Sequence, residues 1–211
     1  MYRLFSTPLT IPALSRKLTK ALIHIVALGY LAGLFALGIA DELGPDPVQT
    51  LLNETGTRAI QFLLLTLAVS PLAKHLPCGD LMKFRRMLGI YSFVFALAHF
   101  LTYVLFELQL DLGLIGSEII KRPYITVGFV ALTGLLSLTL TSPMAIRRRM
   151  GRHWQTLHNA VYLIMLLALL HFTWSQKTGW QEPVWYWIIA LLLLLFRAVP
   201  AYTRLRRKRS V

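Results

Sequence analysis

Cysteine and acidic residues are both scarce in this sequence of 211 residues. The one cysteine, Cys78, excludes an internal disulfide and any iron–sulfur cluster held by cysteines alone. Nine acidic residues stand against 22 lysines and arginines, which gives a net charge of +13. Such a charge can indicate nucleic-acid binding, but here the basic residues form short clusters between apolar runs, as in loops that face an anionic membrane leaflet. We therefore expect a lipid bilayer, and no nucleic acid, among the partners.

Long apolar runs dominate the rest of the sequence. The chain is 56% hydrophobic and its mean hydropathy is +0.59. A soluble domain of this size would not contain repeated uncharged runs of about 20 residues. We expect an all-α membrane protein: a cytoplasmic segment (1–20), a six-transmembrane-helix bundle (21–203) and a basic cytoplasmic tail (204–211). The predicted spans are 21–40, 58–76, 87–106, 123–141, 155–174 and 183–202.

The charges of the connecting loops predict the orientation of the bundle. Of the basic residues in the loops and at the ends of the spans, 17 fall on one side and 4 on the other. Eight of the nine acidic residues, all but Asp80, fall on the side with few basic residues. Because cytoplasmic loops carry the excess of lysine and arginine, both termini are predicted to be cytoplasmic.

Three histidines within the predicted spans, His99, His158 and His171, are the candidate site residues. Ionisable side chains are costly inside hydrocarbon, so each suggests a function. His99 and His171 lie in parallel spans, at depths that differ by about 6 Å at the rise of an α-helix, both toward the outer face. A haem held between two helices needs one imidazole from each at matching depth. We therefore predict that His99 and His171 are the axial pair of a haem iron, a ligation that favours electron transfer.

His158 lies at the inner end of its span and is a candidate ligand of a second haem. No histidine occurs near Arg85 or Arg86, where its partner would be expected. Thirteen residues separate His158 from His171, which places them roughly 140° apart around an ideal helix. The alternative for each histidine is a hydrogen bond to a neighbouring helix. The protein would then be a haem-free transporter or assembly scaffold, with histidines as a proton relay or as packing groups.

Three arginines in the inner loops, Arg85, Arg86 and Arg152, have two interpretations. Membrane topology alone accounts for them. Arginine also pairs well with phosphate and carboxylate groups, so they are candidate contacts for a flavin phosphate or a haem propionate. Both interpretations stay open at this point.

Five segments together carry a resemblance to a known family. They are DPVQTLLNETGTRAIQFLLLTLAVSPL, FRRMLGIYSFVFALAHFLTY, KRPYITVGFVAL, MGRHWQTLHNAVYL and LLHFTW, and they cover nearly the whole chain outside the two termini. They resemble the MsrQ (YedZ) family of the ferric reductase-like transmembrane superfamily. The resemblance implies a protein of the bacterial inner membrane with one or two b-type haems and FMN. It also implies that the haem histidines of the family fall on His99, His158 and His171.

The same resemblance implies a place in an electron-transfer chain. Electrons would come from the quinone pool or from a cytosolic flavin reductase. They would pass to MsrP, a periplasmic molybdenum-cofactor enzyme that reduces methionine sulfoxide in oxidised proteins. This sequence has no counterpart of the flavin and nicotinamide domains of the related oxidases, so we expect an electron-transfer subunit with a separate donor. A self-sufficient ferric reductase is the disfavoured alternative.

Overall fold

The structure is a computed structural model that describes residues 9–176 and 181–209, with side chains apart from those of residue 112 and residues 198–209. The described residues form helices and connecting turns and no strand, which confirms the all-α class. The elements are α1 (Ala13–Ile39), α2 (Pro47–His75), the 3-10 turn η1 (Gly79–Leu81), α3 (Met82–Thr102), the π-helical turn η2 (Tyr103–Glu107), α4 (Leu112–Lys121), α5 (Pro123–Leu140), α6 (Met144–Met150), α7 (Arg152–Asn159), α8 (Val161–Ser175) and α9 (Gln181–Arg209).

Five stretches of described helix are long and apolar enough to cross a membrane. They are α1, α2, the continuous unit Gly79–Glu107, α5, and the unit Arg152–Ser175 formed by α7 and α8. They correspond to the first five predicted spans. The sixth predicted span, 183–202, falls within α9, a helix of 29 residues.

The second helix begins earlier than the sequence predicted. Pro47 is its first residue, a position where the missing N–H costs nothing, and the Asp46 side chain accepts a 2.9 Å hydrogen bond from the Gln49 N–H. Residues 47–57, which precede the predicted second span, are therefore part of the same helix. This extension matters for function because it places Leu52 and Gly56 on a rigid helix.

The fifth predicted span consists of two helices. α7 and α8 meet at Ala160, whose N–H bonds to the Leu157 carbonyl at 2.9 Å in a tight turn. His158 and His171 therefore do not lie on one ideal helix, and the expected 140° separation does not apply to them.

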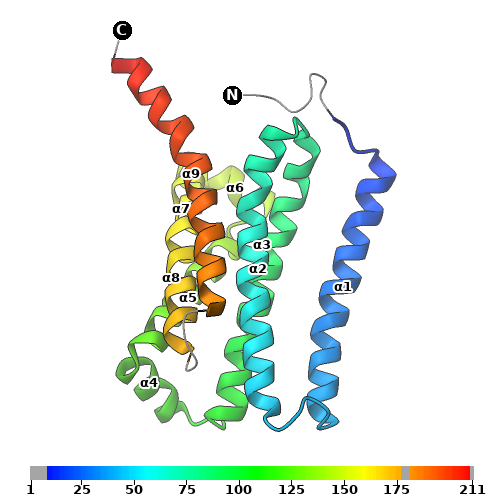
Figure 1. Ribbon diagram of the computed structural model, residues 1–211, viewed down its shortest axis with the longest axis vertical. Helices are drawn as coiled ribbons and strands as arrows, with labels where there is room; N and C mark the ends of the chain where they lie inside the picture. Colours follow the sequence, from blue (N-terminus) through cyan, green and yellow to red (C-terminus); the bar gives the residue numbers. More distant parts are fainter. Residues whose placement is uncertain (1–8, 177–180, 210–211) are drawn as a thin grey trace.

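Two antiparallel helix pairs form the centre of the bundle (Figure 1): α2 lies against α3, and α5 lies against α8. The main core includes Leu63 and Leu67 of α2, Leu135 of α5, and Met165 and Leu169 of α8. α1 stands at one edge and buries only two of its residues, so most of its apolar surface is left for lipid.

The beginning of α1 and the end of α9 lie at the same end of the bundle, together with α6 (Figure 1). α4 lies at the opposite end. The sequence did not predict α4, a ten-residue helix capped by the Asp111 side chain, which accepts from the Gly113 and Leu114 N–H groups. We call the α6 end the inner end and the α4 end the outer end, following the predicted orientation.

Candidate functional site

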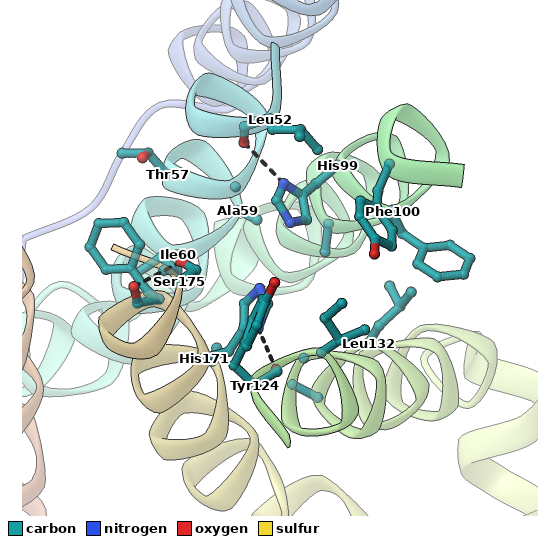
Figure 2. A pocket seen from close by; sticks show the side chains of 18 of the residues that line it. Leu52, Thr57, Ala59, Ile60, His99, Phe100, Tyr124, Leu132, His171 and Ser175 are labelled. Atoms are coloured by element: carbon teal, nitrogen blue, oxygen red, sulfur yellow. Dashed lines mark hydrogen bonds between the residues drawn. The ribbon is translucent and has the colours of Figure 1, made fainter. Parts of the chain in front are cut away.

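A cavity of about 310 Å³ lies between the two central helix pairs, toward the outer end. His99 enters it from α3 and His171 from α8, and the two imidazoles face each other across it (Figure 2). Their ring centroids are 6.0 Å apart and their planes are inclined by 80°. The predicted pair is therefore brought together, although 72 positions separate the two histidines in the sequence.

Backbone carbonyls fix which nitrogen of each imidazole carries the proton. The His99 Nδ1 lies 2.9 Å from the Leu52 carbonyl oxygen, and the His171 Nδ1 lies 2.6 Å from that of Tyr124 (Figure 2). A carbonyl oxygen only accepts, so each neutral imidazole donates from Nδ1. The lone pair is then on Nε2, the nitrogen left to bind a metal. This arrangement of the second nitrogen is usual for metal-bound histidines, because it orients the ring and raises its basicity.

Each imidazole lies against a glycine of the neighbouring helix. A Cβ on Gly56 would lie 3.0 Å from the His99 Nδ1, and one on Gly128 would lie 2.7 Å from the His171 Nδ1. A larger residue at Gly128 would push the His171 ring out of place, and one at Gly56 would require the His99 ring to shift by a few tenths of an ångström. Glycine also lets the ring approach the helix closely enough to reach the carbonyl one turn earlier.

The two helix pairs position their histidines in the same way. In each pair the carbonyl that accepts from the histidine lies 47 residues before it. The glycine follows that carbonyl by four residues, one helical turn. The α3 segment ALAHF and the α8 segment ALLHF surround the two histidines similarly. The cavity is therefore lined by two equivalent halves, each of which presents one Nε2.

These residues fit a haem with two axial histidines. Two metal–nitrogen bonds of about 2 Å, together with the distance from each ring centre to its Nε2, give a centroid separation close to 6.0 Å. Within the described residues no group of three or more histidine, cysteine, aspartate or glutamate side chains converges. A bare ion would find only two ligands here, whereas a porphyrin brings four nitrogens of its own. Apolar residues of α2 and α5, such as Leu63, Ala131 and Leu135, line the inner part of the cavity.

His158 lies elsewhere, at the inner end of the bundle. Its Nε2 is 3.1 Å from the Thr141 Oγ1, and its ring stacks on Trp154 with centroids 4.0 Å apart. The Trp154 Nε1 donates to the Thr141 carbonyl at 2.9 Å, and the Arg147 guanidinium lies 4.5 Å from the centre of the Trp154 ring. The structure thus places His158 in an aromatic and basic cluster, away from the residues that line the histidine cavity.

The three candidate arginines also lie outside that cavity. Arg85 is half-buried on α3, whereas Arg86 and Arg152 are exposed. Their contact with a flavin phosphate or a haem propionate stays a prediction.

Sequence reasoning missed the residues that hold the two imidazoles: Leu52, Gly56, Tyr124 and Gly128. Their repeated unit of 72 positions, from Leu52 to Tyr124, is longer than the 20 to 50 residues of common sequence repeats. The sequence does contain a signal for these residues. The number of positions from Gly56 to His99 equals that from Gly128 to His171, and the segments around them are similar: GTRA resembles GFVA, and ALAHF resembles ALLHF.

The fold and site agree with the comparisons to known proteins. Residues 55–169 match the model of a family described as "ferric reductase like transmembrane component". The matched region extends from α2 to α8 and includes His99 and His158, ending two residues before His171. The match covers more than half of the chain and defines the class: a ferric reductase-like transmembrane protein.

Two curated relatives specify the family further. The chain is 44% identical over 179 residues to a protein of Salmonella arizonae, covering 84% of this chain and 90% of the relative. It is 43% identical over 189 residues to one of Salmonella enteritidis, covering 89% and 93%. Both relatives are named as the haem-binding subunit MsrQ of a protein-methionine-sulfoxide reductase. The chain belongs to the MsrQ family.

Proposed function

We propose that this protein is a haem b-containing membrane subunit that passes electrons to a periplasmic, MsrP-like methionine sulfoxide reductase, for the repair of oxidised periplasmic proteins. One observation supports the proposal above all others: two imidazoles with carbonyl-fixed tautomers face each other across an apolar cavity. The relatives, which are named haem-binding subunits of such a reductase, supply the partner system.

His99 and His171 would hold the iron through their two Nε2 atoms. The haem supplies one-electron redox chemistry when it is bound. The Leu52 and Tyr124 carbonyls keep both rings in the metal-binding tautomer and orientation. The apolar side chains of the inner cavity would keep water away from the bound haem, and ligation by both histidines would leave no coordination position for oxygen. The arrangement therefore suits electron transfer rather than oxygen activation.

The direction of transfer follows from the proposed topology. We infer a six-span bundle in the bacterial inner membrane, with both termini on the cytoplasmic side. The cavity opens among the first turns of α2 and α5 and the last turns of α3 and α8, all at the outer end of the bundle. Electrons on this iron would be delivered at the periplasmic surface, where the acceptor enzyme is expected.

A second group on the inner side would complete the path across the membrane. His158 is the candidate ligand of a second, inner haem, and FMN is the second candidate cofactor, with Arg85, Arg86 and Arg152 as candidate phosphate or propionate contacts. Ligation by the His158 Nε2 would require its hydrogen bond with Thr141 to break. The electron donor in this proposal is the quinone pool or a cytosolic flavin reductase.

Purified protein in detergent tests the proposal. Haem and flavin are quantified per chain, and the haem is reduced chemically under anaerobic conditions. We expect the reduced haem to be fully reoxidised when a catalytic amount of an MsrP-like enzyme and an excess of methionine sulfoxide are added together, and not when either is added alone. Protein from haem-replete cells without Soret absorbance would instead favour the transporter or scaffold alternative.

A further inference from the structure

The cavity between His99 and His171 has two chemically different ends. Its inner part is apolar, whereas polar side chains line its outer mouth. They come from the first turns of α2 and α5 and from the last turns of the α3–η2 unit and α8: Gln49, Asn53, Tyr103, Arg122, Tyr124 and Gln176. A ligand that fits this cavity is expected to be apolar at one edge and polar at the other.

Haem has this distribution of polarity, since its two propionates leave the ring on one edge. An ionised carboxylate is expensive to bury without a partner, so the propionate edge must face the polar mouth. Among the described residues that line the cavity, Arg122 is the one cation, and Glu107, an exposed residue, is the one acid.

Two partners hold Arg122 in place at the mouth of the cavity, and they contact only two of its three guanidinium nitrogens. Its Nε lies 2.5 Å from the Glu118 carboxylate, and its Nη1 donates to the Tyr124 hydroxyl at 3.3 Å. Neither of these contacts uses Nη2. The hydrogen bond with the Tyr124 hydroxyl raises the pKa of Arg122 above its usual value, so the guanidinium stays charged.

Tyr124 connects this cation to the iron ligand. Its ring stacks on His171 with centroids 6.1 Å apart, and its carbonyl accepts from the His171 Nδ1. Its hydroxyl accepts from Arg122, which leaves the phenolic proton free to donate to a carboxylate. Figure 2 shows the Tyr124 side chain alongside the His171 imidazole within the cavity.

We propose that Arg122 and the Tyr124 hydroxyl bind a propionate of the haem at the outer mouth of the cavity. The inference rests on the proposed function and gives it an orientation: the propionate edge faces the outer surface and the apolar edge faces the inner half of the bundle. Arg85, Arg86 and Arg152 then remain for an inner cofactor. The charge of Arg122 stabilises the reduced state, because each electron that reaches the iron adds a negative charge nearby.

Redox titration of three variants tests the charge. Arg122→Gln should retain its haem through the two histidines but have a lower midpoint potential than the parent protein. Arg122→Lys should recover part of the shift. Lys121→Gln is the matched control, since it removes the same charge one residue away from a side chain that does not line the cavity. Equal shifts in Arg122→Gln and Lys121→Gln would overturn the proposal.

Haem with both propionates esterified tests the contact itself. Haem-free parent protein should bind the dimethyl ester about tenfold more weakly than haem, the size expected for loss of a charge-assisted hydrogen bond. Arg122→Gln should discriminate much less between the two. Tyr124→Phe keeps the ring, the carbonyl and the Arg122–Glu118 pair, so it can be measured even if Arg122→Gln does not fold. This variant should lose part of the preference for haem over its ester.

Equal preference for haem over its ester in the parent, Arg122→Gln and Tyr124→Phe proteins would refute the assignment of these residues. A parent protein that binds neither haem nor ester would instead refute the proposed function.

Discussion

The outer histidine pair and the inner histidine contact their neighbours through different nitrogens of the imidazole. At the outer site, His99 and His171 donate from Nδ1 to carbonyls, and Nε2 is left as an acceptor. At the inner site, the Thr141 hydroxyl lies 2.7 Å from the Ser137 carbonyl oxygen, which can only accept, so we infer that the hydroxyl donates there and accepts from the His158 Nε2. On this inference His158 carries its proton on Nε2, the nitrogen that the outer histidines keep free.

The comparison shows what distinguishes a metal-ready histidine within a membrane. All three side chains lie in spans and looked alike as intramembrane ionisable groups. Among the described residues, only the outer two of these histidines have a glycine beneath the ring, a carbonyl at Nδ1 and a facing imidazole. Orientation by the neighbouring helix, rather than depth in the bilayer, separates the two sites.

Removing an outer histidine should produce the largest effect. We expect His171→Ala and His99→Ala to reduce haem per chain by about tenfold or more, since even the outer-shell partners of metal ligands contribute about 10- to 100-fold to affinity. Haem is measured as Soret absorbance relative to protein. His24→Ala is the control, because His24 bonds to the Tyr91 hydroxyl outside this cavity. Full haem content in either cavity variant would refute the pairing.

Substitution of the two glycines tests the support of the outer histidines without replacing either predicted iron ligand. Gly128→Ala should weaken haem binding more than Gly56→Ala, because the added Cβ would lie 2.7 Å rather than 3.0 Å from a ring nitrogen. Overpacking of this kind costs about 1–3 kcal/mol, which corresponds to about a 5- to 150-fold change in affinity.

The control for this series is Gly33→Ala on α1, where a Cβ would meet nothing within 4 Å. It should leave haem affinity unchanged in the same titration. A Gly128→Ala protein with the affinity of Gly33→Ala would show that the His171 ring does not depend on this contact.

The class of fold and the central pair of the site could be predicted from the sequence. Apolar run length identified the helices, because a membrane span has a fixed minimum length. Counting residues into parallel spans then matched His99 with His171. Both inferences rest on the helical rise, which varies little.

The supporting residues could not be predicted in this way. Leu52 acts through its backbone carbonyl, which every residue has, so its side chain gives no indication of this role. Gly56 appeared to lie in a loop because Arg58, Glu54 and Asn53 make the first turns of α2 polar. Those turns are helical because Asp46 caps them and because Glu54 and Arg58 form an ion pair at 2.9 Å. The break between α7 and α8 at Ala160 likewise could not be predicted, because no proline or glycine lies at that point of the sequence.

Removal of His158 should have a smaller effect on the outer site than removal of either outer histidine. His158→Ala should retain the spectrum and midpoint potential of the outer haem, because His158 does not line that cavity. If a second haem is bound at the inner end, haem per chain should fall by about half and no further, since one of two sites is lost. A loss as deep as that of His171→Ala would mean that the two ends of the bundle do not bind independently.

The smallest effect is expected from the hydroxyl that holds His158. Thr141→Val keeps the shape of the side chain and the bond from Trp154 to the Thr141 carbonyl, but removes the acceptor of the His158 Nε2 proton. We expect a loss of about 1 kcal/mol in stability, the usual net value of one hydrogen bond, and an unchanged outer haem spectrum. Nitrogen-15 spectra of histidine-labelled protein should show His158 leaving its single Nε2–H tautomer, while Thr141→Ser, which retains a hydroxyl, keeps it. An Nδ1–H tautomer at His158 in the parent protein would contradict the assignment and make the inner histidine resemble the outer pair.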